Sequence, residues 1–562
     1  MTRQPWLSGN PMPDLKRLFN LNTNFMRTKI LQVSIAAMLS IPMHAQDILW
    51  EKSYGGKHSD YLFDAQPTPD YGFILAGSSL SKKTGNKTDD GNGDLDYFLW
   101  KMDEKGELDW QKSIGGSGAD LLQSVRLTRD GGFILAGTSD SPKGEHKKDE
   151  GFGKEDFWII KLNAKGAEQW QRTIGGSGQE LLQNVVPTSD GGYLLAGTSS
   201  SAKSPKLTAG QPDPFGKSEA GFGNLDYWVV KLDSEGKIEW QKTFGGIYAD
   251  HLRSAVQTRD GGYLLGGSSN SPESGNKTEK SYGMSDYWVI RLDPKGEIEW
   301  QKVYGGDGDD QLQALLQTKD GNFLLAGSSS SATTGNKNAS NGKGTDFWLL
   351  KIDPSGEIVW QKTYDNGQTD LLTSLEENKD GSLLLGGHAQ SETYVTRKKD
   401  REGINDYIAI KTDDKGEEQW TRTVGSNGED ILRKVIETRD GGYILAGTSM
   451  GTPSRDRYSG QGRNDFWVVK LKDKKKREEK RNPIEAYPNP TLHYTNVTVG
   501  YEFQKGTATV YDISGRQLQH FDITDRTVPV DLGGVPEGIY IIEIRTNVQE
   551  DAVKVVKAIN KQ

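Results

Sequence analysis

Two sets of acidic residues recur along the chain, mostly at intervals of 60 residues. Carboxylates gathered on one face could bind calcium, which takes oxygen ligands. However, the sequence lacks an Asp-x-Asp-x-Asp-Gly loop, and acids of this kind often accept hydrogen bonds from backbone N–H groups at turns. We therefore predict structural roles and no metal or cofactor, with calcium as the alternative. The two sets are Asp60, Asp120, Glu180, Asp250, Asp310, Asp370 and Asp430, and Asp96, Asp156, Asp226, Asp286, Asp346, Asp406 and Asp465.

The other residue types with catalytic potential do not form a recognisable constellation. His58, His251 and His388 depart from the repeat consensus but fall in different repeats. The sequence shows no Ser-His-Asp arrangement and no phosphate-binding loop, and it has no cysteine that could act as a nucleophile or a zinc ligand. We assign no catalytic residue and favour a protein that is not an enzyme. A glycoside hydrolase or polysaccharide lyase that uses loop carboxylates is the alternative.

Aromatic residues are the strongest candidates for ligand binding. Phe152, Phe222 and Tyr282 occupy the same place in three consecutive repeats, at the end of a long polar loop. Phe215 lies in the longest of these loops. Aromatic rings on neighbouring loops can stack on sugars or anchor a peptide. The alternative is that the rings pack on nearby glycines and order the loops.

A repeat of about 60 residues must position these side chains, and each copy carries four strand-like runs. In one copy we expect strands at residues 121–128, 133–138, 156–162 and 168–173. Seven β-rich copies that cannot bury their apolar surface alone predict a closed ring, an all-β seven-bladed β-propeller over residues 46–471. The run 48–53 precedes the first copy, so we expect it to supply the outer strand of blade seven. Each copy has one structural tryptophan: Trp50, Trp110, Trp170, Trp240, Trp300, Trp360 and Trp420.

The N-terminal region and the composition indicate an exported protein. Residues 26–45 have the basic start, the apolar run and the small residues of a signal peptide, with cleavage between Ala45 and Gln46. Residues 1–25 fit no signal pattern and are interpreted as a non-native upstream extension. The apolar run is too short to span a membrane, and no transmembrane segment is expected elsewhere. The net charge is −9 without a basic stripe, so a nucleic-acid partner is not expected.

The run from Tyr227 to Trp240, with its Asp-x-x-Gly turn before the tryptophan, resembles the tryptophan-docking repeat of pyrroloquinoline-quinone-type β-propellers. The resemblance implies that each tryptophan packs onto the adjacent blade. The quinone enzymes usually have eight blades and an adjacent cysteine pair at the cofactor. Seven repeats and the absence of cysteine give no reason to expect the quinone here.

A second module follows a charged linker at residues 472–483. Residues 484–562 contain alternating runs at 495–501, 506–512 and 538–545, which predict a small Ig-like β-sandwich. Its motifs resemble the type A C-terminal sorting domain of type IX secretion cargo in Bacteroidetes. That resemblance implies passage through the periplasm and across the outer membrane, with the type IX machinery as partner. The module would then be cleaved, and the protein released or attached to surface lipopolysaccharide. The matching residues are Tyr487, Pro488, Asn489, Pro490, Tyr511, Asp512, Gly515, Gly538, Tyr540 and Lys554.

Long, divergent loops are expected on one face of the propeller and tight turns on the other. Recognition residues usually sit on loops held by a rigid scaffold. We therefore expect a monomeric propeller at the cell surface or outside the cell, whose loop face binds a glycan or a protein. A structural surface or adhesion element is a further alternative to the enzyme already named.

Overall fold

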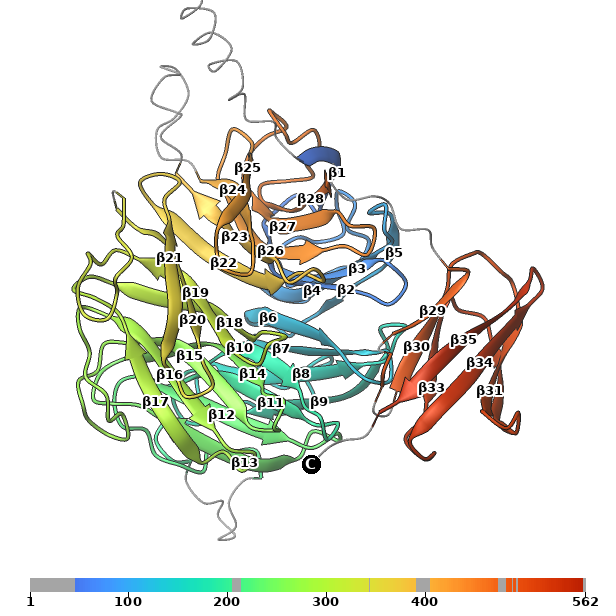
Figure 1. Ribbon diagram of the computed structural model, residues 1–562, viewed down its shortest axis with the longest axis horizontal. Helices are drawn as coiled ribbons and strands as arrows, with labels where there is room; N and C mark the ends of the chain where they lie inside the picture. The colour runs from blue at the N-terminus through green and yellow to red at the C-terminus, as the bar shows by residue number, and fades with distance from the viewer. Residues whose placement is uncertain are drawn as a thin grey trace, which may run out of the picture. The chain divides into compact units, whose positions relative to one another are not determined.

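The computed structural model describes residues 46–204, 214–342, 344–390, 405–473, 482–487, 489–491 and 494–558. Residues 1–25, the signal peptide 26–45 with Ala45, linker residues 474–481 and Pro488 lie outside the described residues. Every regular element in the described ranges is a β-strand (Figure 1). A search of these same ranges finds no helix able to cross a membrane.

Residues 46–473 form seven four-stranded antiparallel sheets, or blades. The first strands are β2 (Asp60–Pro67), β6 (Asp120–Leu127), β10 (Glu180–Pro187), β14 (Asp250–Gln257), β18 (Asp310–Gln317), β22 (Asp370–Glu377) and β26 (Asp430–Glu437). The second strands are β3 (Phe73–Ser79), β7 (Phe133–Ser139), β11 (Tyr193–Ser199), β15 (Tyr263–Ser269), β19 (Phe323–Ser329), β23 (Leu383–Ala389) and β27 (Tyr443–Ser449). The third strands are β4 (Asp96–Met102), β8 (Asp156–Leu162), β12 (Asp226–Leu232), β16 (Asp286–Leu292), β20 (Asp346–Ile352), β24 (Asp406–Thr412) and β28 (Asp465–Asp473). The fourth strands are β5 (Leu108–Ile114), β9 (Glu168–Ile174), β13 (Ile238–Phe244), β17 (Ile298–Tyr304), β21 (Ile358–Tyr364), β25 (Glu418–Val424) and β1 (Gln46–Tyr54).

The N-terminal strand closes the ring, as the sequence predicts. Strand β1 pairs antiparallel with β28 and becomes the outer strand of blade seven (Figure 1). Across the same seam, the backbone N–H of Leu62 in β2 donates to Thr448 Oγ1 in β27 at 2.9 Å. Buried side chains of the first and last blades form one core cluster, which includes Tyr54 and Phe466. The sheets therefore form a closed β-propeller with no free edge at the seam.

Burial explains the strand patterns. The second strands, such as β7, are buried along their whole length, and third strands such as β8 are buried at all or nearly all positions, because each sheet packs between two neighbours. The fourth strands are partly exposed, as expected of an outer edge. The tryptophan of each fourth strand docks on the next blade: a Cβ placed on Gly166, whose φ is +78°, would lie 3.3 Å from the Trp110 ring. The docking implied by the sequence resemblance is therefore present.

The C-terminal module consists of two packed sheets. One contains β29 (Ile484–Tyr487), β30 (Tyr494–Val499) and β33 (Thr527–Asp531). The other contains β32 (Gln517–Ile523), β31 (Gly506–Asp512), β34 (Gly538–Thr546) and β35 (Glu550–Lys557). Val497 and Val530 from the first sheet share a buried cluster with Val510 and Ile542 from the second, so the module is a β-sandwich.

The predicted strand ends differ from the observed ones by one or two residues. In blade two the first strand covers Asp120–Leu127 and the fourth covers Glu168–Ile174. Strand β28 extends to Asp473, two residues past the expected end of the propeller. In the sandwich, β29, β32 and β33 were not anticipated. Strand β29 is short, and β32 and β33 carry polar residues at many positions, so their apolar pattern is weak.

Candidate functional site

The strand order separates two faces of the propeller. We call the face that carries the connections between second and third strands, and between successive blades, the loop face. The opposite face carries the tight hairpin turns and is called the turn face. In blade two the loop-face segments are 140–155 and 175–179, and the turn-face segments are 128–132 and 163–167.

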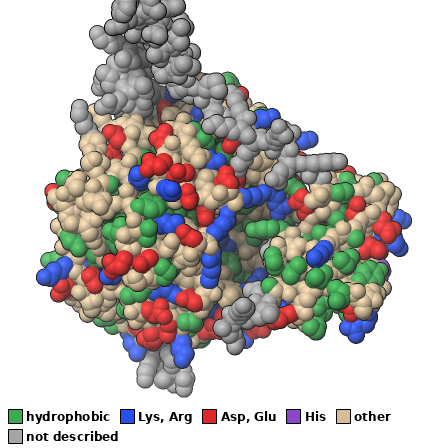
Figure 2. Space-filling view, in the orientation of Figure 1, with side chains coloured by type: hydrophobic (Ala, Val, Ile, Leu, Met, Phe, Trp, Pro, Cys, Tyr) green, Lys and Arg blue, Asp and Glu red, His purple; other side chains and the backbone are tan. Residues whose placement is uncertain are grey.

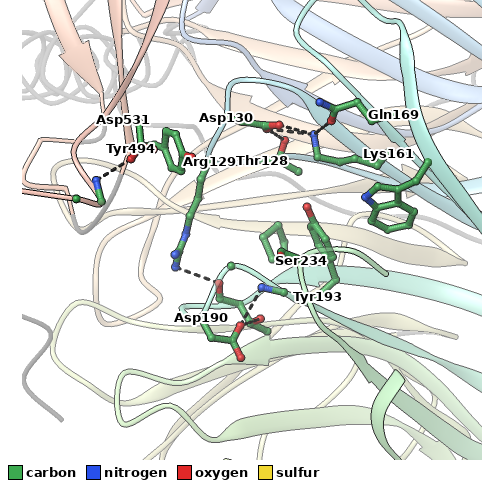
Figure 3. A pocket seen from close by; sticks show the side chains of 17 residues that line it. Thr128, Arg129, Asp130, Lys161, Gln169, Asp190, Tyr193, Ser234, Tyr494 and Asp531 are labelled. Carbon is green, nitrogen blue, oxygen red and sulfur yellow. Dashed lines mark hydrogen bonds and ion pairs between the residues drawn. The ribbon is translucent and has the colours of Figure 1, made fainter. Parts of the chain in front are cut away.

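The turn face carries a polar cluster that recurs around the ring. Figure 3 shows Lys161 between Asp130 and Gln169, with Nζ to oxygen distances of 2.9 and 2.8 Å. Burial alone would raise the pKa of Asp130, but hydrogen bonds from Thr128 and Lys161 outweigh it and lower the pKa. Because every blade has the same pair, we assign it to holding the two hairpins of one blade together. The pairs are Lys101–Asp70, Lys161–Asp130, Lys231–Asp190, Arg291–Asp260, Lys351–Asp320, Lys411–Asp380 and Lys470–Asp440.

The two sets of recurring acids meet beneath the loop face. In blade two, Asp156 Oδ2 accepts the backbone N–H of Phe152 at 2.7 Å, and Glu180 Oε2 accepts that of Gly176 at 2.7 Å. Both acids are fully buried. Burial raises the pKa of Asp156 to about 6, the Glu180 charge adds to that rise, and the buried Lys147 opposes it. These acids fix the loop backbones, which is the structural role that the sequence predicts for them.

The packing around these acids bears on the calcium alternative. Among the described residues, the second oxygen of Asp156 has no hydrogen-bond partner, and it lies against Gly175, where a Cβ would be only 1.8 Å away. One blade departs from this arrangement, because Asp365 stands where each of the other six blades has a glycine, such as Gly175 or Gly425. Carboxylate oxygens of Asp365, Asp346 and Asp370 lie within 4.8 Å of one another. Since acids gather without an ion in many proteins, we assign no metal to this group.

The loop-face acids also position the candidate aromatic residues. The backbone N–H of Phe222 donates to Asp226 and that of Tyr282 to Asp286, both at 2.8 Å, as Phe152 does in blade two. The Phe222 and Tyr282 side chains are 43% and 49% exposed. One side of each ring packs on a glycine of the next blade, since Cβ atoms on Gly275 and Gly335 would lie 3.0 Å from these side chains. The rings therefore order the loops and also present an open surface.

The structure does not group all four aromatic candidates. Phe152 is half-buried at the equivalent place in blade two. Phe215, like Trp170, is partly buried against the core cluster that contains Trp228, and the guanidinium of Arg172 lies 5.5 Å from the Phe215 ring centroid. Phe222 and Tyr282 thus remain as the more exposed pair, while Phe215 packs inward.

Three exposed apolar residues beside this pair were missed from the sequence. Ile247 and Tyr248 are 49% and 50% exposed, and Met284 is 73% exposed. The N–H of Asn224, two residues after Phe222, donates to the carbonyl of Tyr248 at 3.1 Å, so the two segments are adjacent. We call Phe222, Ile247, Tyr248, Tyr282 and Met284 the apolar sector. A signal was available, because the positions equivalent to Ile247-Tyr248 in the connections that lead into blades two and three are Ser117-Gly118 and Ser177-Gly178.

The sorting-motif residues come from several elements of the sandwich, including β29, β31, β34 and β35. Asn489 Nδ2 donates to the Lys554 carbonyl at 2.7 Å, and Asn489 Oδ1 accepts the N–H of Val556 at 2.9 Å. The opening motif is therefore clasped to the last strand. Asp512 accepts the N–H groups of Ser514 and Arg516, which closes a turn where Gly515 has a φ of +82°.

Comparison with known protein families identifies the C-terminal module. Residues 485–558 match the family described as the secretion system C-terminal sorting domain. Regulatory protein FlaEY of Caulobacter vibrioides is 23% identical over 314 residues, which are 51% of this chain and 31% of that protein. The chain therefore spans about a third of the length of this curated relative.

Solved structures with related folds include two propeller-like chains. The WD40 domain of Pan2 from Neurospora crassa aligns with a TM-score of 0.41 at 11% identity, covering 78% of this chain and 98% of that chain. Puromycin hydrolase aligns with a TM-score of 0.39 at 11% identity, covering 87% of this chain and 59% of that chain. Scores at this level carry no argument about function, and the propeller assignment depends on the sheets themselves.

Proposed function

Because residues 485–558 are a sorting domain that directs type IX secretion to the cell surface or the extracellular space, we propose that the protein binds a glycan or a protein there through its apolar sector. The observation that carries the proposal is the exposure of Phe222, Tyr248 and Tyr282 on loops pinned by buried acids. Exposed aromatic side chains on a rigid scaffold lose little conformational entropy on binding.

The apolar sector suits a ligand with both polar and apolar surfaces. Tyr248 and Tyr282 present hydroxyl groups beside flat rings, while Ile247 and Met284 supply aliphatic contact. Sugar rings and aromatic or aliphatic peptide side chains both match this chemistry. Met284 is unbranched and adapts its shape to a partner, which favours a contact surface of this kind.

The chemistry of the acids supports binding over hydrolysis. The carboxyls with raised pKa values, such as Asp156 and Asp370, are fully buried and already accept backbone N–H groups. A glycoside hydrolase needs two carboxyls that reach the scissile bond from either side. We therefore keep the hydrolase or lyase as the weaker proposal, together with a purely structural surface element.

The sorting module suggests two fates for the propeller after secretion. We propose that the module is removed outside the outer membrane and that the propeller is then released or attached to surface lipopolysaccharide. In either case the loop face would meet extracellular ligands.

A binding screen with matched variants tests the proposal. The purified protein would be applied to arrays of oligosaccharides and extracellular proteins, and each hit would be titrated by calorimetry. We expect a Phe222→Ala/Tyr248→Ala variant to lose at least about tenfold in affinity, which corresponds to about 1.4 kcal/mol. Tyr458→Ala is the control, because Tyr458 is 75% exposed on a loop-face segment of blade seven, outside the apolar sector. Equal affinity of the double variant and the control would refute the assignment.

A further inference from the structure

The first strands of all seven blades surround a cavity of about 260 Å³ at the centre of the ring. One residue from each first strand lines it at an equivalent position: Phe63, Gln123, Gln183, Arg253, Gln313, Thr373 and Arg433. Glutamine is the commonest residue of this set, so Arg253 and Arg433 are departures from the repeat. A residue that differs between otherwise similar blades is not needed by the blade itself.

The two arginines are short of partners. The Nε atoms of Arg253 and Arg433 are buried and have no hydrogen-bond partner among the described residues. Arg253 Nη1 makes one long contact of 3.4 Å with Gln183 Oε1, and the Arg433 guanidinium lies 5.4 Å from the Phe63 ring centroid. A guanidinium has five donors in a fixed fork, and leaving a buried charged donor unpaired is unfavourable by several kcal/mol in general.

The charges around the cavity leave an excess of positive charge. Its charged lining residues within the described part of the chain are Asp64, Arg126, Arg253, Arg433 and Lys434. Asp64 forms an ion pair with Arg126 and also accepts the N–H of Val125. Its negative charge is therefore compensated by Arg126 and does not neutralise the other cations. The remaining three are cationic, although the whole chain has a net charge of −9 and its visible exterior shows both signs interspersed (Figure 2).

The charges of the two arginines add to the effect of burial on two histidines. Burial and, secondarily, the charge of Arg433 lower the pKa of His388 to about 4. Burial and the charge of Arg253 lower the pKa of His251. Glu376 is not among the residues that line the cavity; it accepts the N–H of Glu437, and the cation whose charge lowers its pKa is Lys434, not either arginine.

We propose that the central cavity binds a small anion that carries a carboxylate or phosphate group, held between Arg253 and Arg433. Guanidinium forks match the planar carboxylate and the phosphate oxygens with two parallel hydrogen bonds. The amides of Gln123, Gln183 and Gln313 line the same level of the cavity and can donate to further oxygens. The Thr373 hydroxyl already donates to the Leu432 carbonyl at 2.9 Å. A water molecule occupies about 30 Å³ in the liquid, so the cavity suits an anion of a few to about a dozen heavy atoms.

Calorimetry and thermal unfolding of the full-length protein test the site. Sodium phosphate, malonate and glucuronate would be titrated separately at constant ionic strength, with chloride as the background anion. We expect saturable binding of one anion per chain, with a rise in Tm. Binding of phosphate alone would assign a phosphate ligand, and binding of the two carboxylates alone would assign a carboxylate ligand. Absence of saturable binding by all three would overturn the proposal.

Variants separate the cavity from general charge effects. Arg253→Gln/Arg433→Gln should weaken the anion affinity by at least about tenfold. Lys302→Gln/Lys362→Gln removes the same charge from the outer strands, where both lysines pair with exposed glutamates, and should leave the affinity within about twofold. Without added anion, the double arginine variant should unfold no earlier than wild type, because a buried repulsion is removed. Each single Gln variant gives the same comparison if the double variant does not fold. An unchanged affinity in the arginine variants would contradict the proposal.

Discussion

Closure of the ring by β1 can be tested with two equivalent pairs of aromatic residues. Trp50 and Tyr54 lie on β1, and Trp300 and Tyr304 lie on β17 at the same positions of blade four. The hydroxyls of Tyr54 and Tyr304 donate to the carbonyls of Gly106 and Gly356 at 2.8 and 2.7 Å. Each tyrosine is almost fully buried, and each tryptophan is partly buried against its core cluster.

We expect the two double alanine variants to lose similar local energy. Replacing a buried aromatic residue by alanine destabilises by about 3–5 kcal/mol, and a half-buried one by roughly half of that. The lost hydrogen bond adds about 1 kcal/mol. Each double variant should therefore lose about 7 kcal/mol, a large part of the 5–15 kcal/mol typical of a folded domain.

The variants should differ in where the protein opens. Strand β17 stays tethered to β16 by a short hairpin, whereas β1 meets β28 only through pairing between distant parts of the chain. Trp50→Ala/Tyr54→Ala should therefore speed amide exchange in β26–β28 and β2, while Trp300→Ala/Tyr304→Ala should speed it mainly in β16–β18. Hydrogen–deuterium exchange with mass spectrometry measures this directly. If blade seven kept wild-type protection in the Trp50→Ala/Tyr54→Ala variant, the reasoning about the seam would be wrong.

Three further predictions concern the acids and the sorting module. Gly175→Ala should destabilise the protein by about 1–3 kcal/mol in urea titrations, because the new Cβ would collide with Asp156. Asp365→Gly, at the equivalent position of blade five, should be tolerated. Equal effects of the two variants on stability would contradict this packing argument. Burial raises the pKa of Asp370 to about 7 and that of Asp430 to about 6, whereas the pKa of an aspartate in the unfolded chain is near 3.8. At pH values between these limits the folded state therefore binds more protons than the unfolded state. Stability should therefore fall as pH rises from about 4 to 7, and Asp370→Asn should flatten that slope of Tm against pH; an unchanged slope would count against the buried acids as its source. Asn489→Ala should remove the two hydrogen bonds to β35 and reduce the amount of protein that reaches the cell surface, as measured by cell fractionation. Asn547→Ala, an exposed position in the same module, is the comparison. Normal export of the Asn489→Ala variant would show that these hydrogen bonds are not required for secretion.

The sequence was sufficient for the architecture because the repeat makes the same signals visible many times. The tryptophan docking and the exchange of β1 follow from the order of strands, and the structure contains both. Strand ends were less accurate, since the last residue of a strand depends on pairing with its neighbour. The acids were also interpreted correctly as supports of backbone loops, because a residue present in every blade serves every blade.

The surface was harder to predict. The exposure of Phe222 depends on how its ring packs against the next blade, and the inward packing of Phe215 depends on Arg172. Neither contact can be inferred from the position of these residues in the sequence. Ile247 and Tyr248 could have been found by comparing the segments between blades. The same comparison within the first strands would have singled out Arg253 and Arg433. Only the three-dimensional structure reveals that their Nε atoms have no hydrogen-bond partner among the described residues.

Hydrogen–deuterium exchange of the protein with and without a ligand from the array tests the central claim most directly. The account predicts added protection in segments 222–224, 246–248 and 282–285, which contain the apolar sector, with the turn face unchanged. Protection confined to the turn face, or to loop-face segments of the other blades, would contradict the proposal that the apolar sector binds the extracellular ligand.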